Sequence, residues 1–269
     1  MDWEKSLDVA VAAAGAAADV LLQQHGGDAE VRYKEDGTPV SRADAAAEVA
    51  VRSVISEAFP DDRILGEEFG SVGGGSRCWV VDPLDNTACY LRSSSEYAVI
   101  VGLVEESRPV IGVVVTPHDG AVWRAVSGQG AWGPDGRRLR CSGTDRLEDA
   151  TVTFASLRRW REIGLADPLG RITDTAFHES LHGGFRGMLA VAAGTVDLNL
   201  DPWGSLWDHA GLVPLLEESG AVCRRVALDA RQVGLVAGPE PLVRAAAEAG
   251  LPLSEGAWDP RSYGKGVGA

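Results

Sequence analysis

Apolar residues recur at helical spacing in two segments near the start of the chain. The first lies between residues 6 and 24, where Gly26 and Gly27 end the pattern. The second begins at Ser41, a residue type that caps helix N-termini well, and runs to about Phe59. Both segments are therefore predicted to be helices, and the first is expected to cover a sheet.

Four apolar runs after these helices have the composition of strands. Residues 78–81 form a short run of β-branched and aromatic side chains. Residues 97–104, 109–116 and 121–126 are similar runs, separated by residues that favour turns. Because strands joined by short turns pair with their neighbours in sequence, these three predict an antiparallel meander.

The pattern changes near residue 148 to strands that alternate with helices. Strands are expected at 151–155, 196–200 and 233–237, and helices at 185–193, 206–219 and 242–249. No change in composition marks a linker, so two packed halves, 1–147 and 148–269, are expected to form one compact unit. The segment 256–269 is rich in glycine and polar residues and is predicted to be poorly ordered.

Composition and charge narrow the classes of function. The 269 residues carry a net charge of −14, which argues against nucleic acid polymers and anionic membranes as partners. The four cysteines are scattered without a C-x-x-C pair, which favours free thiols in a reducing compartment. There is no signal-peptide pattern and no uncharged apolar run of about 18 residues, so a cytoplasmic location away from the membrane is predicted.

The stretch C-W-V-V-D-P-L-D-N-T, residues 78–87, carries the clearest chemistry. Pro83 cannot donate to a sheet ladder, so the strand is expected to end there, with Asp82 and Asp85 just past it. Open α/β sheets place ligand sites at such strand ends. Two adjacent carboxylates keep their charge best around a cation, and oxygen ligands suit magnesium. The alternative is an ordinary turn, since aspartate, proline and asparagine are common turn residues.

Two further acidic stretches make a family resemblance specific. G-E-E contains Glu67 at the end of an apolar run, and W-D-H-A-G contains Asp208 at the start of a predicted helix. In this order, G-E-E, D-P-L-D-N-T and W-D-H-A-G resemble the motifs of the inositol monophosphatase family of magnesium-dependent phosphatases. The resemblance spans residue 34 to about residue 238. It implies an α/β fold of the αβαβα sandwich type and a homodimer.

The resemblance also implies roles for individual residues. Mg²⁺ would be held by side chains from three segments and one carbonyl: Glu67, Asp82, Asp85, Asp208 and the carbonyl of Leu84. V-S-R-A-D resembles a family segment whose aspartate, here Asp44, orients the attacking water with Thr87, and Glu67 is counted among the catalytic residues as well. For Asp44, a purely structural role at a helix N-terminus is the alternative. Backbone N–H groups of Asn86 and Thr87 would hold phosphate oxygens.

Within the family, the chain resembles the histidinol-phosphate phosphatases most. The segments F-A-S-L (154–157), I-T-D-T (172–175) and W-D-H-A-G-L-V-P-L-L-E (207–217) match patterns of that group. Asp201, seven residues before Asp208, matches an acidic position that contacts substrate. Asn86 departs from the motif by replacing a glycine. Gly184 also departs, because it stands where relatives carry an aspartate that faces the substrate.

These observations predict a Mg²⁺-dependent phosphatase for a small phosphomonoester, with histidinol phosphate as a candidate substrate. A phosphatase for another sugar, inositol or nucleotide phosphate is one alternative, and an inactive family member with a binding or regulatory role is another. His178 and His182 stand four apart, but without a nearby glutamate base they are interpreted as loop residues rather than a zinc pair. The cluster R-R-W-R at 158–161 is either a solvated face or a contact for a substrate phosphate or a partner subunit.

Overall fold

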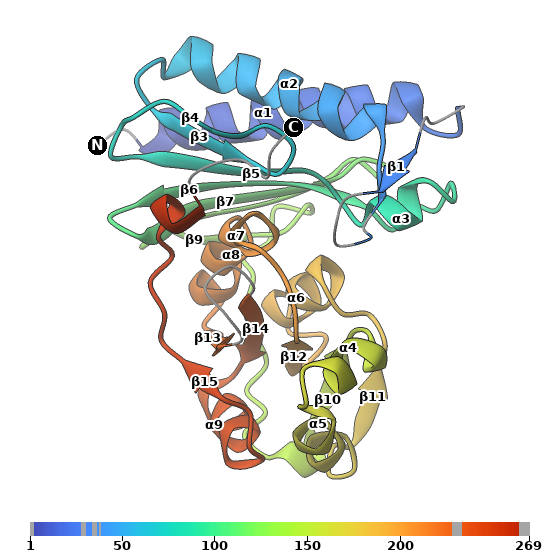
Figure 1. Cartoon of the computed structure of the whole chain (residues 1–269). Coiled ribbons are helices and arrows are strands. Elements are labelled where there is room, and N and C mark those ends of the chain that lie inside the picture. The colour runs from blue at the N-terminus through green and yellow to red at the C-terminus, as the bar shows by residue number, and fades with distance from the viewer. Residues whose placement is uncertain (1–2, 28–30, 34–36, 38, 228–232, 264–269) are drawn as a thin grey trace.

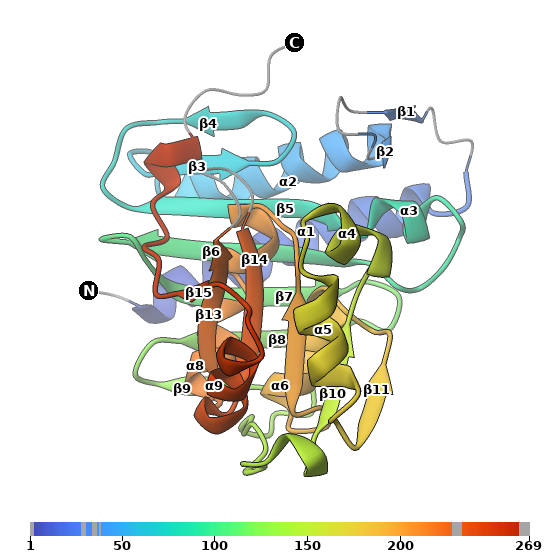
Figure 2. The same cartoon turned by 60° about the horizontal axis from the view of Figure 1, so that its bottom comes forward.

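The fold is a stack of five alternating helix and sheet layers (Figures 1 and 2). In a computed structural model of the chain, residues 3–27, 31–33, 37, 39–227 and 233–263 are described. From one side to the other, the layers are a helix pair, a seven-stranded sheet, a middle helix layer, a six-stranded sheet and an outer helix layer. The predicted αβαβα sandwich is confirmed.

The first layer consists of α1 (Trp3–Gln24) and α2 (Arg42–Ala58), both predicted. One face of α1 is a stripe of buried small residues with Leu21 at its end, and it packs against α2 and the first sheet. By length and hydropathy alone α1 could cross a membrane, a test that the core helix of a soluble protein and a signal sequence near the N-terminus also pass. The short strands β1 (Arg32–Tyr33) and β2 (Pro39–Val40) pair antiparallel between these helices.

The first sheet has the strand order β4-β3-β5-β6-β7-β8-β9. Its strands are β3 (Arg63–Gly66), β4 (Gly70–Val72), β5 (Cys78–Asp85), β6 (Ala98–Glu105), β7 (Arg108–Thr116), β8 (Ala121–Val126) and β9 (Gly130–Trp132). The predicted meander of β6, β7 and β8 is confirmed. Strands β4 and β9 were not predicted, because three residues are too few to show a period.

The end predicted for the strand at Pro83 is wrong. Strand β5 continues to Asp85, with its register to β6 shifting between Asp82 and Asp85. Pro83 lies inside this irregularity, where the ladder needs no N–H donor. The sheet therefore carries both aspartates on the strand itself rather than on a turn beyond it.

The middle layer contains α6 (Phe185–Ala192), α7 (Leu206–Ala210) and α8 (Val213–Glu218). The single helix predicted over 206–219 is therefore two helices. Pro214 lies in the first turn of α8 and has no N–H to bond to the carbonyl of Ala210, so a continuous helical ladder is impossible there. The two short helices can then follow different directions over the first sheet.

The second sheet has the order β11-β10-β12-β14-β13-β15, in which β10 pairs parallel with both β11 and β12. Its strands are β10 (Thr151–Phe154), β11 (His178–Ser180), β12 (Leu198–Asp201), β13 (Val222–Ala227), β14 (Val233–Gly238) and β15 (Leu253–Ser254). The outer layer is α4 (Leu157–Glu162), α5 (Ala166–Thr173) and α9 (Glu240–Glu248). Sequence periodicity missed α4, α5, β11, β13 and β15. The division at residues 147 and 148 stays a prediction.

Strand β12 shows how the sheet separates two cores. Leu198 and Leu200 point into the outer core against α5 and α9. Asn199 and Asp201 alternate with them and therefore face the middle layer, where the first sheet lies beyond. The side chain of Asp201, at the C-terminal end of β12, thus lies on the face that is turned toward the first sheet.

The junction of α7 and α8 rests directly on the backbone of the first sheet. Gly102 on β6 and Gly112 on β7 are paired across the two strands. A Cβ at Gly112 would lie 2.0 Å from the carbonyl oxygen of Gly211, and a Cβ at Gly102 would lie 2.7 Å from the carbonyl carbon of Ala210. The glycine pair therefore makes the space that lets this junction approach the sheet.

The C-terminal segment returns to the first sheet, contrary to the predicted disorder. The backbone N–H of Trp258 donates to the carbonyl of Ser107 at 3.0 Å, and Pro260–Tyr263 form a 3₁₀ helix. Figure 1 shows this segment crossing from β15 to the edge of the first sheet. The prediction for residues 264–269 concerns residues outside the described ranges.

Changing Gly112 to alanine tests the close approach. Because the new Cβ must displace the α7–α8 backbone, we expect Gly112→Ala to lower the free energy of unfolding by about 1–3 kcal/mol. Gly15→Ala is the matched control, since a Cβ there meets nothing within 4 Å and the helix should gain about 0.5–1 kcal/mol. Denaturant titration of both variants measures the difference, and equal stabilities would contradict the contact.

Candidate active site

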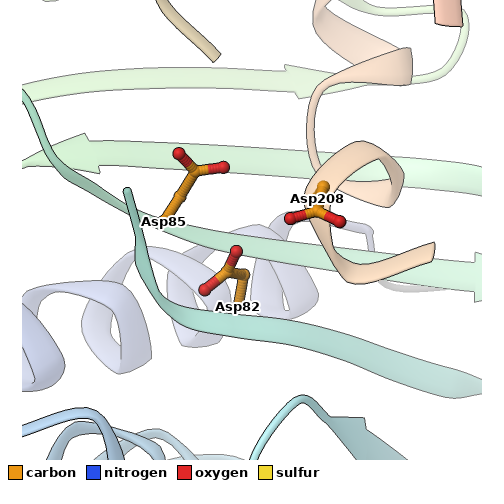
Figure 3. Close-up of side chains that lie close together, drawn as sticks. All are labelled: Asp82, Asp85 and Asp208. Atoms are coloured by element: carbon orange, nitrogen blue, oxygen red, sulfur yellow. The ribbon is translucent and has the colours of Figure 1, made fainter. Parts of the chain in front are cut away.

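Three carboxylates from two distant segments meet at the interface between the first sheet and the middle layer. Asp82 and Asp85 come from β5 and Asp208 from α7 (Figure 3). One oxygen of each side chain lies within 4.8 Å of an oxygen of each of the others. The sequence predicted all three as metal ligands, and the fold brings them together across more than 120 residues of chain.

The irregular part of β5 directs its two aspartates to one place. Asp82 is opposite Ile100 and Asp85 opposite Ala98, with Pro83 and Leu84 in the shifted register between them. The Leu84 N–H donates to Asp82 Oδ1 at 3.0 Å, which fixes the buried carboxylate. In a regular strand, side chains alternate between the two faces, so those at positions 82 and 85 would point to opposite faces. The bulge lets both side chains face the same side.

Asp208 is held by the start of its own helix. Ser205 is the N-cap of α7, and its backbone N–H donates to Asp208 Oδ2 in a capping box. The predicted cap at Ser205 is confirmed. His209 is fully buried beside Trp258, and its ring lies against the backbone of Gly204.

The cluster is electrostatically unfavourable without a cation. Burial, followed by the charges of Glu67, Asp85 and Asp208, raises the pKa of Asp82 well above its usual value. Burial, followed by Asp208, Asp201 and Glu67, does the same to the pKa of Asp85. A hard divalent cation would remove this repulsion, and carboxylate oxygens are the donors that Mg²⁺ prefers. The donor set therefore fits Mg²⁺.

Glu67 lies next to this cluster and follows β3. Its N–H donates to the carbonyl of Val81 on β5, which ties the residue to the strand that carries the aspartates. Its charge acts on both Asp82 and Asp85. Glu67 does not belong to the group of three with mutual distances under 4.8 Å among the described residues. It therefore borders the cluster.

Asp44 and Thr87 form the hydrogen-bonded pair that the sequence predicted. Thr87 Oγ1 lies 3.0 Å from Asp44 Oδ1 and 3.1 Å from the carbonyl oxygen of Leu84, so its single proton can go to either acceptor. The other oxygen of Asp44 accepts from the N–H and the hydroxyl of Ser41 at 2.8 and 2.7 Å. Asp44 thus has the capping role and the Thr87 contact at once, so the two interpretations of this residue are compatible.

Asn86, which stands where the family motif has glycine, adopts a left-handed backbone conformation. Its φ and ψ are 67° and 47°, in the left-handed region that asparagine tolerates better than most residues. Its side-chain Nδ2 donates to the carbonyl of Glu96 at 2.7 Å, and it begins the short helix α3 (Thr87–Tyr90). The replacement therefore keeps the turn and adds an anchor to the following loop.

Asp201 and Gly184 lie together at the end of β12. Asp201 is 7% exposed and accepts from the N–H of Trp203 at 3.2 Å. Burial raises its pKa to about 7, against the opposing effects of the Trp203 and Gly184 N–H groups and the charge of Arg159. Gly184 has φ 68° and ψ −152°, a region that is essentially restricted to glycine. An aspartate there would be strained even though a Cβ would meet nothing within 4 Å.

The basic cluster at 158–161 separates into three different environments. Arg158 is exposed and lies 3.6 Å from Glu162, and Trp160 is fully buried. The guanidinium of Arg159 lies 4.3 Å from the ring centroid of Trp203, beside Asp201. The sequence left the role of the cluster open, and only Arg159 reaches the side of the candidate site.

Two other observations concern residues outside the cluster. His178 lies in strand β11 and His182 in the following loop, where its Nδ1 is 2.6 Å from Ser180 Oγ, so no helix places the two rings together. Glu48, which the sequence analysis missed, is fully buried behind the Glu67 turn. Its spacing of four residues from Asp44 on a helix was the available signal.

Comparisons with known proteins identify the family of the chain. The model of the inositol monophosphatase family matches residues 2–251. A histidinol-phosphatase of Streptomyces coelicolor is 38% identical over 201 residues, which cover 72% of this chain and 76% of that protein. A histidinol-phosphatase of Mycobacterium tuberculosis is 36% identical over 217 residues, covering 79% and 81%.

A solved structure shows the same architecture over nearly the whole chain. The extragenic suppressor protein SuhB from Bartonella henselae superposes with a TM-score of 0.82 at 26% identity, covering 91% of this chain and 97% of that one. The family model, the relatives and the fold thus identify the same family. The chain belongs to the inositol monophosphatase family.

Proposed function

We propose that this protein is a Mg²⁺-dependent phosphatase that hydrolyses a small phosphomonoester. The observation that carries the proposal is the cluster of Asp82, Asp85 and Asp208, whose oxygens lie close enough together to share cations. The function of its histidinol-phosphatase relatives supports the same reaction class. A net charge of −14 would otherwise repel a phosphate ester, so the cation also reverses the local sign.

The metal ligands in this proposal come from three segments. They are the carboxylates of Glu67, Asp82, Asp85 and Asp208, with the carbonyl of Leu84. When bound there, Mg²⁺ supplies the positive charge that phosphoryl transfer requires on the transferring group and on the attacking water. The backbone N–H groups of Asn86 and Thr87 would then orient the phosphate oxygens.

The Thr87–Asp44 pair would orient the attacking water and accept its proton. Thr87 Oγ1 can accept a hydrogen bond from water while it donates to Asp44 Oδ1 at 3.0 Å. The second oxygen of Asp44 is already occupied by Ser41, which fixes the carboxylate plane. A positioned carboxylate of this kind commonly contributes about 10²–10⁴-fold as a general base.

Histidinol phosphate is the first substrate candidate, because two of the relatives carry the name histidinol-phosphatase. Asp201 could receive the cationic amine of such a substrate, since it is a carboxylate at the side of the cluster. A buried carboxylate gains most from a charged partner when that partner replaces lost solvation.

A phosphate ester of a sugar or another polyol is the second candidate, and Arg159 favours it. The guanidinium beside Asp201 already provides a positive charge there, and Gly184 supplies no carboxylate in addition. A neutral hydroxyl-bearing group meets no repulsion from Arg159, whereas an ammonium group does. An inactive binding protein is disfavoured, because the carboxylate cluster and the Thr87–Asp44 pair are both present.

The proposal also places the enzyme in the cytoplasm as a homodimer. The dimer rests on the family resemblance alone, and the cytoplasmic location on the four scattered cysteines, which favour a reducing compartment. The substrate is a small molecule rather than a nucleic acid or a membrane lipid, which the negative net charge supports.

Replacing Asp85 tests the metal assignment. Asp85→Asn removes the negative charge of one proposed metal ligand. Loss of a residue that only supports a ligand typically costs about 10–100-fold, so we expect loss of the ligand itself to lower Mg²⁺-dependent phosphate release by more than about 100-fold. The metal-free variant should be at least as stable as wild type, because a repelled carboxylate has gone. Asp62→Asn is the control and should keep its activity, since Asp62 accepts a hydrogen bond from Trp79 Nε1 at the other end of β5. Normal turnover by Asp85→Asn would refute the assignment.

Replacing Arg159 tests the choice between substrates. Without the neighbouring cation, Arg159→Ala should raise kcat/KM for histidinol phosphate relative to inositol 1-phosphate by about tenfold, the lower end for one charged contact. Arg158→Ala is the matched control, because Arg158 is exposed and paired with Glu162. An unchanged ratio in Arg159→Ala would show that this arginine does not act on the substrate.

The raised pKa of Asp201 predicts a pH-dependent stability. Its pKa of about 7 lies above the unfolded value of 3.8, so the folded state holds the proton more tightly. Its stabilising contribution is complete below about pH 4 and is lost as pH rises through 7. In EDTA, Asp201→Asn should therefore gain melting temperature relative to wild type between pH 4 and pH 8. A difference that is constant with pH would contradict the shift.

A further inference from the structure

Helix α2 carries a second buried carboxylate that the proposed reaction does not use. Glu48 lies one turn after Asp44 and has no solvent exposure. Isolated buried carboxylates are costly, so one that is retained needs specific partners. One partner of Glu48, Arg52, lies on the same helix. Its other partners lie in the turn that contains Glu67.

Each oxygen of Glu48 accepts from this turn. Oε2 accepts from the N–H of Glu68 at 2.7 Å, and Oε1 lies 3.3 Å from the N–H of Phe69. Oε1 also accepts from Arg52 Nε at 2.7 Å, and Arg52 Nη2 continues to the carbonyl of Gly70 at 2.5 Å. Glu48 and Arg52 together therefore hold both the N–H groups of the turn and its exit into β4.

These contacts fix the backbone of Glu67 from both sides. The N–H of Glu67 itself donates to Val81 on β5, and the next two N–H groups point to Glu48. A Cβ at Gly66 would lie 2.1 Å from Glu48 Oε1, so the carboxylate approaches the chain at a position that only glycine allows. The turn is thus shaped around the Glu48 carboxylate.

We propose that Glu48 is a positioning residue that holds Glu67 against the aspartate cluster. The inference rests on the proposed function, in which Glu67 is a metal ligand. The negative charges of Asp82 and Asp85 repel Glu67 before a cation binds, and a free turn would relax away from them. By accepting from the two N–H groups that follow Glu67, Glu48 keeps the ligand in place, so that cation binding does not have to order the turn.

The same helix then serves two parts of the site. Asp44, at the start of α2, contacts Thr87, and Glu48, one turn later, contacts the Glu67 turn. Residues four apart lie on one face of a helix, so a single rigid element sets the distance between the pair at Thr87 and the bordering ligand. This assigns α2 a role in metal affinity in addition to its packing on the first sheet.

The test is the affinity of the metal-free protein for Mg²⁺, measured by titration calorimetry without substrate. Groups behind metal ligands typically contribute 10–100-fold to affinity. Glu48→Gln keeps one acceptor but loses the charge that Arg52 and two N–H groups require, so we expect an affinity loss in that range. At saturating Mg²⁺, kcat should stay within about threefold of wild type, because Asp44 and Thr87 are unchanged.

Glu218→Gln provides a matched control. The carboxylate of Glu218 also accepts from two N–H groups of a turn, those of Gly128 and Gly130 at 2.6 and 2.7 Å, but this turn carries no proposed ligand. Thermal unfolding in EDTA should show a similar loss of stability in both variants. Only Glu48→Gln should lose Mg²⁺ affinity, and a purely structural role predicts no such difference.

A second variant keeps the test decisive if Glu48→Gln folds poorly. Arg52→Leu leaves the carboxylate in place but removes its cation and the bond to Gly70, so it should weaken Mg²⁺ binding by a smaller factor. Wild-type affinity in a folded Glu48→Gln or Arg52→Leu protein would overturn the inference. If wild type itself binds no Mg²⁺ and releases no phosphate, the proposed function fails instead.

Discussion

The close approach of the Ala210–Gly211 backbone to the Gly102–Gly112 pair is the constraint on which the site depends. Asp208 lies in α7, immediately before this junction, and Asp82 and Asp85 lie on β5, the neighbour of β6 in the sheet. Any side chain between helix and sheet would separate the two groups of carboxylates. The absence of a Cβ at two positions therefore sets the distance at which cations can be shared.

Helix starts give the site much of its rigidity. Asp44 and Asp208 each occupy the third position of a helix whose N-cap is a serine, and each closes a capping box with that serine. A carboxylate at this position also gains from the partial positive charge of the helix N-terminus. The same bonds that stabilise α2 and α7 thus fix two side chains of the candidate site: Asp44, which contacts Thr87, and Asp208, which belongs to the carboxylate cluster.

The carboxylate cluster lowers the stability of the fold when no cation is bound. Burial raises the pKa values of Asp82, Asp85 and Asp201, and repulsion from neighbouring carboxylates raises those of Asp82 and Asp85 further. Part of the folding free energy is therefore lost whenever these groups are charged without a cation. Rigid supports oppose the repulsion: the Leu84 N–H at Asp82 and the capping box at Asp208. The fold thus holds the three carboxylates close together without a cation.

The sequence by itself determined the long helices, the meander, the family and the carboxylates, because these follow from local periodicity and from motifs whose spacing is preserved. Tertiary structure decided the rest. The bulge that keeps β5 going through Pro83 depends on pairing with β6, and the division of 206–219 into two helices depends on Pro214 and on contact with Gly112. The position of Arg159 beside the site depends on its contact with Trp203, and the role of Glu48 depends on its bonds to the turn at Glu67. Contacts between residues far apart in the chain leave no local period, which is why the supports of the site could be found only in the folded molecule.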